Sequence, residues 1–433
     1  MSQAAVLTDA QVLSRDRRVT TLIGVSHGAS HFFQLALPPL FVLINASHGI
    51  SFTQLGILTG AFYIASAVCQ PPSGFLVDRF GARVVLLGGL GLISASTALM
   101  GLLPYYPAMF VLSILAGAGN SVFHPCDYSI MNATISDKRI ARAFSFHMFG
   151  GYIGYASAPI AMTVAGTWLG WQAAVVIAGL VGLGIFSVLW GGSRDFRDST
   201  HERAESGTAA PPLSESLKAL MAAPIVLCWM FFLIVAMGQI GLQTFVPTLF
   251  EKIYAFDLKL GGFYVTLMLC FVAFGVLCGG YIADYFRKPD RVVTFGYATA
   301  LVAVLAIWRY DLTGSTIPLG PLVPLLGLEF EAVQTGLCLA FALIGFMYGI
   351  AFPSRELLVR AATPKGASGR VFGFVYSGMD FGSASTPILF GFFVDSGIPR
   401  TAFLCVAAFW ATAIVIMLAT NAATQRQAAV AAE

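Results

Sequence analysis

The sequence predicts an all-α membrane protein, with twelve transmembrane helices in two pseudo-symmetric six-helix bundles. Of its 433 residues, 57% are hydrophobic and only 10% are charged, whereas soluble domains carry about 25% charged residues. Apolar stretches of the roughly 20 residues that a bilayer-spanning helix needs recur between residues 20 and 420. The second half of the chain also repeats motifs of the first half.

The order of the apolar stretches gives the domain organisation. A long polar stretch, residues 191–222, is predicted to be a flexible cytoplasmic linker. It separates an N-terminal bundle at residues 20–190 from a C-terminal bundle at 223–420, with cytoplasmic tails at 1–19 and 421–433. The predicted spans are 20–44, 53–77, 84–103, 108–135, 141–165, 171–190, 223–248, 260–282, 291–309, 334–359, 371–393 and 400–420.

The distribution of basic residues predicts the orientation. Nineteen of the 24 Lys and Arg residues fall in the two tails and in the connections that follow even-numbered spans. Cytoplasmic loops of membrane proteins collect Lys and Arg, so both termini are expected in the cytoplasm. The net charge of +3 is modest and lies in loops, which argues against a nucleic-acid-binding surface.

Motifs typical of enzymes and of metal or nucleotide sites are not found. The seven cysteines are scattered through apolar segments, without a CxxC pair or Cys/His ligand spacing. No phosphate-binding loop, Ser/His/Asp order or His/Glu metal spacing is present. The sequence therefore predicts no metal, no cofactor and no enzymatic activity, and it excludes ATP as the energy source.

An internal repeat relates the two halves. The segment "GFLVDRFGAR" (74–83) recurs as "GYIADYFRKPDR" (280–291), which aligns Asp78 with Asp284. Further on, "FHPCDYSIMNATISDKRIARAF" aligns without a gap with "AFPSRELLVRAATPKGASGRVF" and matches Asp127 to Arg355. Matching residues are further apart in the chain in the second alignment than in the first. This difference fits an extra external loop at 311–332, whose role is open. Parallel six-helix repeats are one way in which transporters are built, and their pseudo-symmetry predicts that Asp127 faces Arg355.

Twelve spans, a central linker and the doubled Gly-x-x-x-Asp-Arg-x-Gly loop resemble the major facilitator superfamily over the whole chain. "FHP" followed by an acidic residue, together with "SHF" in the first span, is similar to the fosmidomycin-resistance branch. The resemblance implies that the first, fourth, seventh and tenth spans line a central cavity. It also implies a gating role, in which one conformation of the alternating-access cycle is held, for Gly74, Asp78, Arg79, Gly81, Arg83 and Asp284.

Polar side chains of different spans are predicted to lie at one depth. At 1.5 Å per residue, His27 and His31 lie about 10 and 16 Å from the inner end of the first span. Asp127 and His124 lie about 12 and 16 Å from the inner end of the fourth. Burial of ionisable groups in hydrocarbon is costly. We expect these groups to offset that cost by interacting with one another, with Arg355 and with cavity water.

The types of these residues suggest their roles. Arg355 is predicted to anchor an anionic substrate, because its guanidinium stays charged and presents a fork that suits a carboxylate or phosphonate. Asp127 is a candidate for the coupling proton, and Glu356 and Asp380 are further candidates. A fixed Asp127–Arg355 ion pair that locks the halves is the alternative. The other candidate substrate-binding residues, for which hydrogen bonding between helices is the alternative, are His27, His31, His124, Gln239, Gln243, Tyr152 and Tyr155.

Three further positions carry structural predictions. Pro125 and Pro353 each remove a backbone donor and predict a local break of the helix. His147, near the inner end of the fifth span, is interpreted as structural.

Together these observations predict a proton-coupled secondary active transporter that moves a small organic anion by alternating access. A drug/proton antiporter of the fosmidomycin-resistance type is the first alternative. A non-transporting membrane sensor or scaffold is the second, although the linker and tails offer little room for a partner-binding domain. The expected partners are an anionic small molecule, protons and the lipid bilayer. The chain is expected to be a monomer in a bacterial inner membrane.

Overall fold

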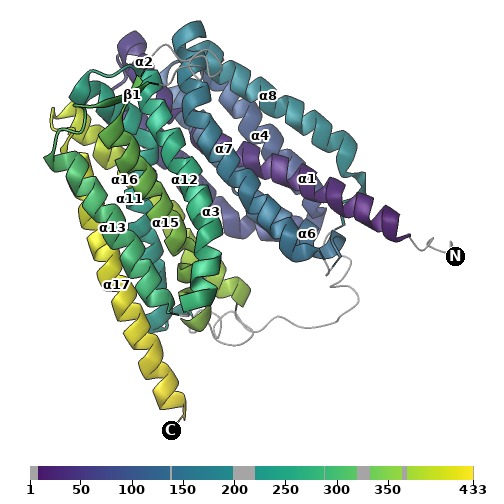
Figure 1. The fold of residues 1–433 in the computed structure, drawn as a ribbon. Helices are drawn as coiled ribbons and strands as arrows, with labels where there is room; N and C mark the ends of the chain where they lie inside the picture. The colour runs from purple at the N-terminus through teal and green to yellow at the C-terminus, as the bar shows by residue number, and fades with distance from the viewer. Residues whose placement is uncertain are drawn as a thin grey trace. The chain divides into compact units, whose positions relative to one another are not determined.

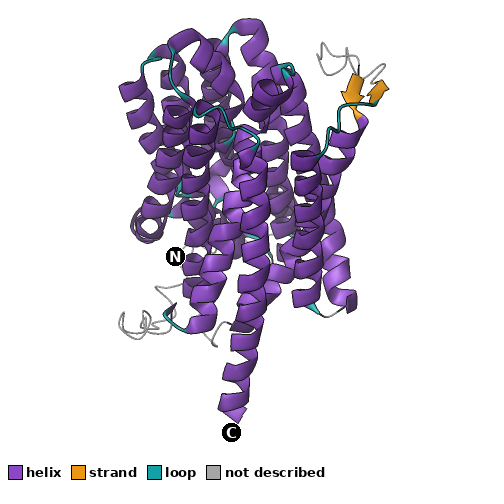
Figure 2. Cartoon of the chain, turned by 90° about the vertical axis from the view of Figure 1, so that its left-hand side faces the viewer, coloured by secondary structure: helices purple, strands orange, loops and turns teal. Residues whose placement is uncertain are grey.

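The computed structural model describes residues 8–136, 139–197, 220–286, 288–318, 332–362 and 368–432. Within these residues the chain is built almost entirely of helices, as the ribbon and the cartoon show (Figure 1; Figure 2). They form twelve long segments in the predicted order. The segments are α1 (Asp9–Gln34) with α2 (Phe41–His48), α3 (Phe52–Phe80), α4 (Ala82–Leu102), α5 (Tyr106–Asn120) with α6 (Phe123–Thr134), α7 (Ile140–Leu169), α8 (Trp171–Gly192), α11 (Ala223–Tyr254), α12 (Leu258–Phe286), α13 (Pro289–Arg309), α15 (Thr335–Ala362), α16 (Ser368–Asp395) and α17 (Thr401–Ala432).

The predicted membrane-spanning character is confirmed. Ten helical segments of the described chain are long and apolar enough to cross a bilayer. The helices α7 and α16, which are 30 and 28 residues long, stand at the fifth and eleventh predicted spans. Two predicted tails are partly helical, because α1 begins at Asp9 and α17 continues to Ala432.

Two of the twelve segments are interrupted. The first bends through a short 3-10 helix, Pro38–Leu40, whose prolines cannot continue the α-helical hydrogen-bond ladder. The fourth breaks between α5 and α6, just before Pro125, so the break predicted there is confirmed. The break predicted at Pro353 is wrong, because α15 is continuous through that residue. A proline inside a membrane helix is tolerated when neighbouring groups satisfy the freed carbonyl.

Contacts divide the chain into two units. Unit 1 comprises Met1–Gln34, Ala65–Tyr155 and Val175–Ala209, and unit 2 comprises Leu35–Ile64, Ala156–Ala174 and Ala210–Glu433. This grouping differs from a division at the linker. Residues 35–64 and 156–174, which come from the first half of the sequence, pack with the helices of the second half.

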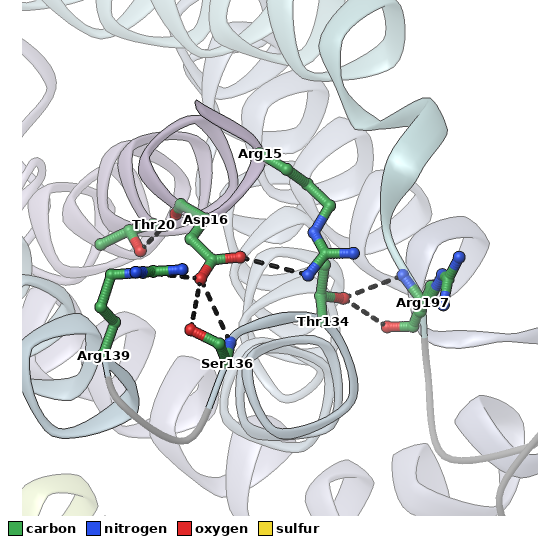
Figure 3. A network of polar contacts seen from close by, with 7 residues as sticks. All are labelled: Arg15, Asp16, Thr20, Thr134, Ser136, Arg139 and Arg197. Atoms are coloured by element: carbon green, nitrogen blue, oxygen red, sulfur yellow. Dashed lines mark hydrogen bonds and ion pairs between the residues drawn. The ribbon is translucent and has the colours of Figure 1, made fainter. Parts of the chain in front are cut away.

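In unit 1, the first turns of α1 are fixed by a buried carboxylate. Asp16 is 2% exposed and accepts hydrogen bonds from the backbone N–H of Ser136 at 3.2 Å and from its hydroxyl at 2.8 Å. The Nε of Arg139 donates to the same oxygen at 2.9 Å, and Arg15 reaches the other oxygen at 3.3 Å (Figure 3). One carboxylate thus joins α1 to the connection between α6 and α7.

Replacing Asp16 by Asn is expected to lower the free energy of unfolding by roughly 2 kcal/mol, because hydrogen bonds to a charged group are lost while a buried polar group stays. Thermal unfolding of the purified protein in detergent measures the change. Asp9→Asn is the matched control, since Asp9 lies exposed in the first turn of the same helix. Equal unfolding temperatures for the two variants would contradict the structural role of Asp16.

The turn between α3 and α4 carries the predicted gating motif. Gly81 has a φ of 83°, a conformation that favours glycine, and it precedes the first residue of α4. The Nε of Arg83 donates to the hydroxyl of Ser193 at 2.8 Å, and its Nη2 donates to the carbonyl of Trp190 at 3.0 Å. The gating role stays a prediction.

Four further residues have a predicted gating role: Gly74, Asp78, Arg79 and Asp284. Gly74 and Arg79 lie in α3, where the guanidinium of Arg79 sits 5.3 Å from the ring of Phe80. The side chains of Asp78 and Asp284 lie outside the part of the structure that is described.

In unit 2 the helices of the second half of the chain pack against one another. α12 and α13 both pack on α15, and α11 packs on α16 and α17 (Figure 1). Part of the predicted extra loop forms a short antiparallel pair, β1 (Thr316–Pro318) with β2 (Ala332–Gln334), shown in orange in Figure 2. Residues 319–331 lie outside the described chain.

The beginning of α3 is held by a carboxylate from α16. Asp395 accepts hydrogen bonds from the backbone N–H of Phe52 at 3.0 Å and from that of Thr53 at 2.7 Å. The Thr53 hydroxyl donates to it at 2.5 Å. A carboxylate at a helix N-terminus satisfies free N–H groups and interacts favourably with the helix dipole. Asp395 therefore attaches an early segment of the chain to a late one.

Candidate functional site

Four histidines and an aspartate from three helices form one cluster in unit 1. We call it the histidine cluster; its members are His27 and His31 from α1, His124 and Asp127 from α6, and His147 from α7. The four- and three-residue spacings within α1 and α6 place each pair on one helix face. Asp127, His27 and His147 are each no more than 1% exposed.

The distances within the histidine cluster are short. The Oδ2 of Asp127 lies 3.2 Å from the Nδ1 of His27 and 3.8 Å from the Nδ1 of His147. The Nε2 atoms of His27 and His31 are 3.0 Å apart, within hydrogen-bond distance. The ring of His147 stacks on that of His27 with a centroid distance of 3.7 Å, and the His124 ring lies 5.2 Å from it. The predicted meeting of spans one and four at a common depth is confirmed by these contacts.

Close backbone approach brings α1 and α7 together at this place. A Cβ atom on Gly150 would lie 2.5 Å from the carbonyl oxygen of Gly24, and one on Gly28 would lie 2.8 Å from that of Gly150. Small residues allow such an approach between membrane helices. The interpretation of His147 as merely structural missed this convergence, although the neighbouring "GGYIG" indicates a close helix contact.

A series of hydrogen-bonded polar side chains lies next to the histidine cluster. The Tyr155 ring lies 4.1 Å from the His31 ring, and its hydroxyl donates to the Oε1 of Gln34 at 2.6 Å. The amide of Gln34 donates to Asn120 at 3.3 Å, and Asn120 donates to the Ser66 hydroxyl at 3.0 Å. Tyr155 was predicted as a site residue, whereas Gln34, Asn120 and Ser66 were not. A single amide or hydroxyl in an apolar helix gives no signal of its own.

In unit 2, Arg355 of α15 is surrounded mainly by aromatic side chains. It is 1% exposed, and its guanidinium carbon lies 3.7 Å from the centre of the Phe352 ring and 4.8 Å from that of Phe232. Its Nη1 donates to the Tyr348 hydroxyl at 3.3 Å, and its Nε lies 3.3 Å from the Oε1 of Glu356. The Nη2 has no hydrogen-bond partner among the described residues. The buried guanidinium of Arg355 therefore keeps one donor nitrogen, Nη2, available to a ligand.

Among the remaining candidates, Gln239, Gln243 and Asp380 belong to unit 2 and Tyr152 belongs to unit 1. Gln243 is fully buried on α11, and both atoms of its amide lack a hydrogen-bond partner within the described chain. It follows Phe232 by eleven residues, which is about 16 Å along a helix. Gln239 and Asp380 are half-buried on α11 and α16, and Tyr152 is buried on α7. Their roles stay predictions.

Among the described residues, the ion-pair partners of Asp127 and Arg355 differ from the predicted mutual pair. Those of Asp127 are His27 and His147 in unit 1, and that of Arg355 is Glu356 in unit 2. Each charge is therefore partly compensated within its own unit. The pairing of Asp127 with Arg355 stays a prediction.

Comparisons with known proteins agree with this architecture. The profile of the Major Facilitator Superfamily matches residues 23–331. A probable L-galactonate transporter of Escherichia coli (strain K12) is 25% identical over 258 residues, which cover 57% of this chain and only 56% of that protein. The fosmidomycin resistance protein of the same strain is 25% identical over 374 residues, which cover 84% of each chain.

A solved structure has the same fold. The crystal structure of a bacterial homologue of the human lysosomal transporter Spinster, in an inward-facing and occupied conformation, superimposes with a TM-score of 0.75 at 14% identity. The match covers 94% of this chain and 97% of that one. The predicted fold class, the resemblance and the non-enzymatic character are confirmed: the chain is an integral membrane transporter that belongs to the Major Facilitator Superfamily.

Proposed function

We propose that this transporter is a proton-coupled secondary active transporter that carries a small organic anion of the carboxylate class by alternating access. The observation that carries the proposal is the buried Arg355 with its acidic neighbour Glu356. A guanidinium presents several N–H donors in one plane and binds a carboxylate with two parallel hydrogen bonds. One relative is named for L-galactonate, which is itself a carboxylate.

Glu356 couples the binding of a proton to the binding of the anion. It lies 3.3 Å from Arg355 and is 24% exposed, whereas Arg355 is 1% exposed. An ionised Glu356 compensates the guanidinium and competes with a substrate anion. A protonated Glu356 leaves the positive charge uncompensated and favours anion binding. Proton and anion therefore bind together, which is the requirement for symport.

Glu356→Gln is expected to uncouple transport from the proton gradient. In proteoliposomes with an inward proton gradient, the wild type accumulates the anion above its external concentration, whereas the variant only equilibrates it. Glu251→Gln is the control, since Glu251 is 31% exposed and pairs with Lys252 on α11. Gradient-driven accumulation by Glu356→Gln at the wild-type level would exclude Glu356 as the coupling group.

Drug/proton antiport is the second candidate, and the similarity to a fosmidomycin resistance protein over 84% of each chain favours it. The two functions predict opposite proton flow. Uptake of a carboxylate that is driven by inward protons supports symport. Extrusion of a phosphonate that is driven by protons moving the other way supports antiport. The same proteoliposomes, loaded on either side, distinguish them.

A further inference from the structure

The histidine cluster has the composition of a transition-metal site. His27, His124 and His147 come from three different helices, and one ligand nitrogen from each lies within 4.8 Å of the others. The Oδ2 of Asp127 lies 3.2 Å from the Nδ1 of His27 and 3.8 Å from that of His147. Three imidazole nitrogens thus lie near one another, and a carboxylate oxygen lies close to two of these imidazoles.

Apart from the ion-pair contacts among themselves, the polar atoms of this group lack the hydrogen bonds that buried groups normally make. Both ring nitrogens of His147, the Nδ1 of His27 and both oxygens of Asp127 are buried without a hydrogen bond from the described residues. Buried polar side-chain atoms are usually hydrogen-bonded, and each exception calls for an explanation. Several imidazoles so close together repel as cations, whereas neutral imidazoles offer lone pairs. A dication bound by these lone pairs explains their arrangement.

We propose that His27, His124, His147 and Asp127 bind a divalent transition-metal ion of the zinc class. Imidazole nitrogen with one carboxylate oxygen suits zinc, cobalt and nickel, and four ligands satisfy the tetrahedral preference of zinc. Ligand bonds of about 2.0–2.2 Å place neighbouring ligand atoms about 3.3–3.6 Å apart in a tetrahedron. Metal binding therefore requires the present spacings of up to 4.8 Å to shorten.

His31 completes the arrangement as a positioning residue. When the Nδ1 of His27 is a ligand, its Nε2 carries the proton and donates to the Nε2 of His31, 3.0 Å away. Ligating histidines commonly use their second nitrogen in this way, and the loss of such a partner weakens metal binding about 10- to 100-fold. The metal would fix α6, which begins at a helix break, to α1 and α7.

Metal binding by the full-length, tag-free protein in detergent tests the proposal. The protein is treated with EDTA, desalted and titrated with Co²⁺ while visible absorption is recorded. We expect one equivalent of Co²⁺ with the intense bands of tetrahedral coordination, displaced by one equivalent of Zn²⁺ and not by Mg²⁺. A wild-type protein that binds no Co²⁺, or gives only weak octahedral bands, overturns the proposal without any variant.

Variants then identify the ligands. His147→Gln and Asp127→Asn are expected to abolish the tetrahedral spectrum, and His31→Gln is expected to weaken Co²⁺ binding about 10- to 100-fold. His48→Gln is the control, because His48 is exposed at the end of α2 and outside the cluster. An unchanged spectrum in monodisperse His147→Gln protein contradicts the assignment. Arg355→Ala is expected to bind Co²⁺ like the wild type, so that failure of the proposed transport function and failure of metal binding are distinguishable.

Discussion

Replacing Arg355 by alanine is expected to abolish anion transport. Truncating one partner of a buried, hydrogen-bonded charge pair costs about 2–5 kcal/mol, which is a loss of affinity of about 30-fold or more. Arg355 is a buried guanidinium with a donor that no described residue satisfies, so a bound anion loses its main partner. The remaining Glu356 is 24% exposed and can be hydrated, which limits the cost to stability.

Two measurements check this expectation. A thermal-shift screen of mono- and dicarboxylates identifies an anion that stabilises the wild type, and the same anion should not stabilise Arg355→Ala. Uptake into proteoliposomes should fall to the level of empty vesicles. Arg309→Ala serves as the control, because Arg309 is exposed at the end of α13. Wild-type stabilisation and uptake in monodisperse Arg355→Ala protein would remove the basis of the proposed function.

Replacing Gly150 by leucine is expected to lower the free energy of unfolding by about 3 kcal/mol, the upper end of the range for an overpacked site. The first added carbon would lie 2.5 Å from the carbonyl oxygen of Gly24. That oxygen belongs to the backbone of α1 and cannot rotate away as a side chain does. Helices α1 and α7 must separate, and the His27–His147 stacking at 3.7 Å must be lost with them.

Thermal unfolding in detergent measures the change, with Gly184→Leu as the matched control. Gly184 is also a glycine within a membrane helix, α8, but a Cβ there has no heavy atom within 4 Å. Its substitution should leave the unfolding temperature nearly unchanged. Equal effects of the two substitutions would show that the α1–α7 contact is less tight than the structure indicates.

The membrane-spanning architecture could be predicted because the bilayer imposes a simple requirement on each segment. A stretch of about 20 apolar residues must form a helix there, since no water satisfies its backbone groups. Periodicity of side chains contributes little, because these helices are apolar all round. The helix breaks show the limit of this prediction. Pro125 indicated the break between α5 and α6, whereas α15 continues through Pro353.

The candidate site could be predicted only where two polar residues share a helix face. The spacings of His27 with His31 and of His124 with Asp127 pointed to a common layer, and the contacts confirm that these pairs meet. His147 stood alone in its span, and nothing local showed which way it faced. The sequence prediction assigns Asp16 to a polar tail, whereas the residue is only 2% exposed. Helix rotation is decided by packing, which a single sequence does not reveal.

The attachment of α3 to Asp395 has a consequence for biogenesis. The backbone donor of Phe52 and the carboxylate are 343 positions apart in the chain. At a synthesis rate of about 5–20 residues per second, roughly 20–70 s pass before the acceptor leaves the ribosome. During that interval the start of α3 lacks its final partner, so a nascent chain truncated before residue 395 should remain a substrate for membrane chaperones and quality-control proteases.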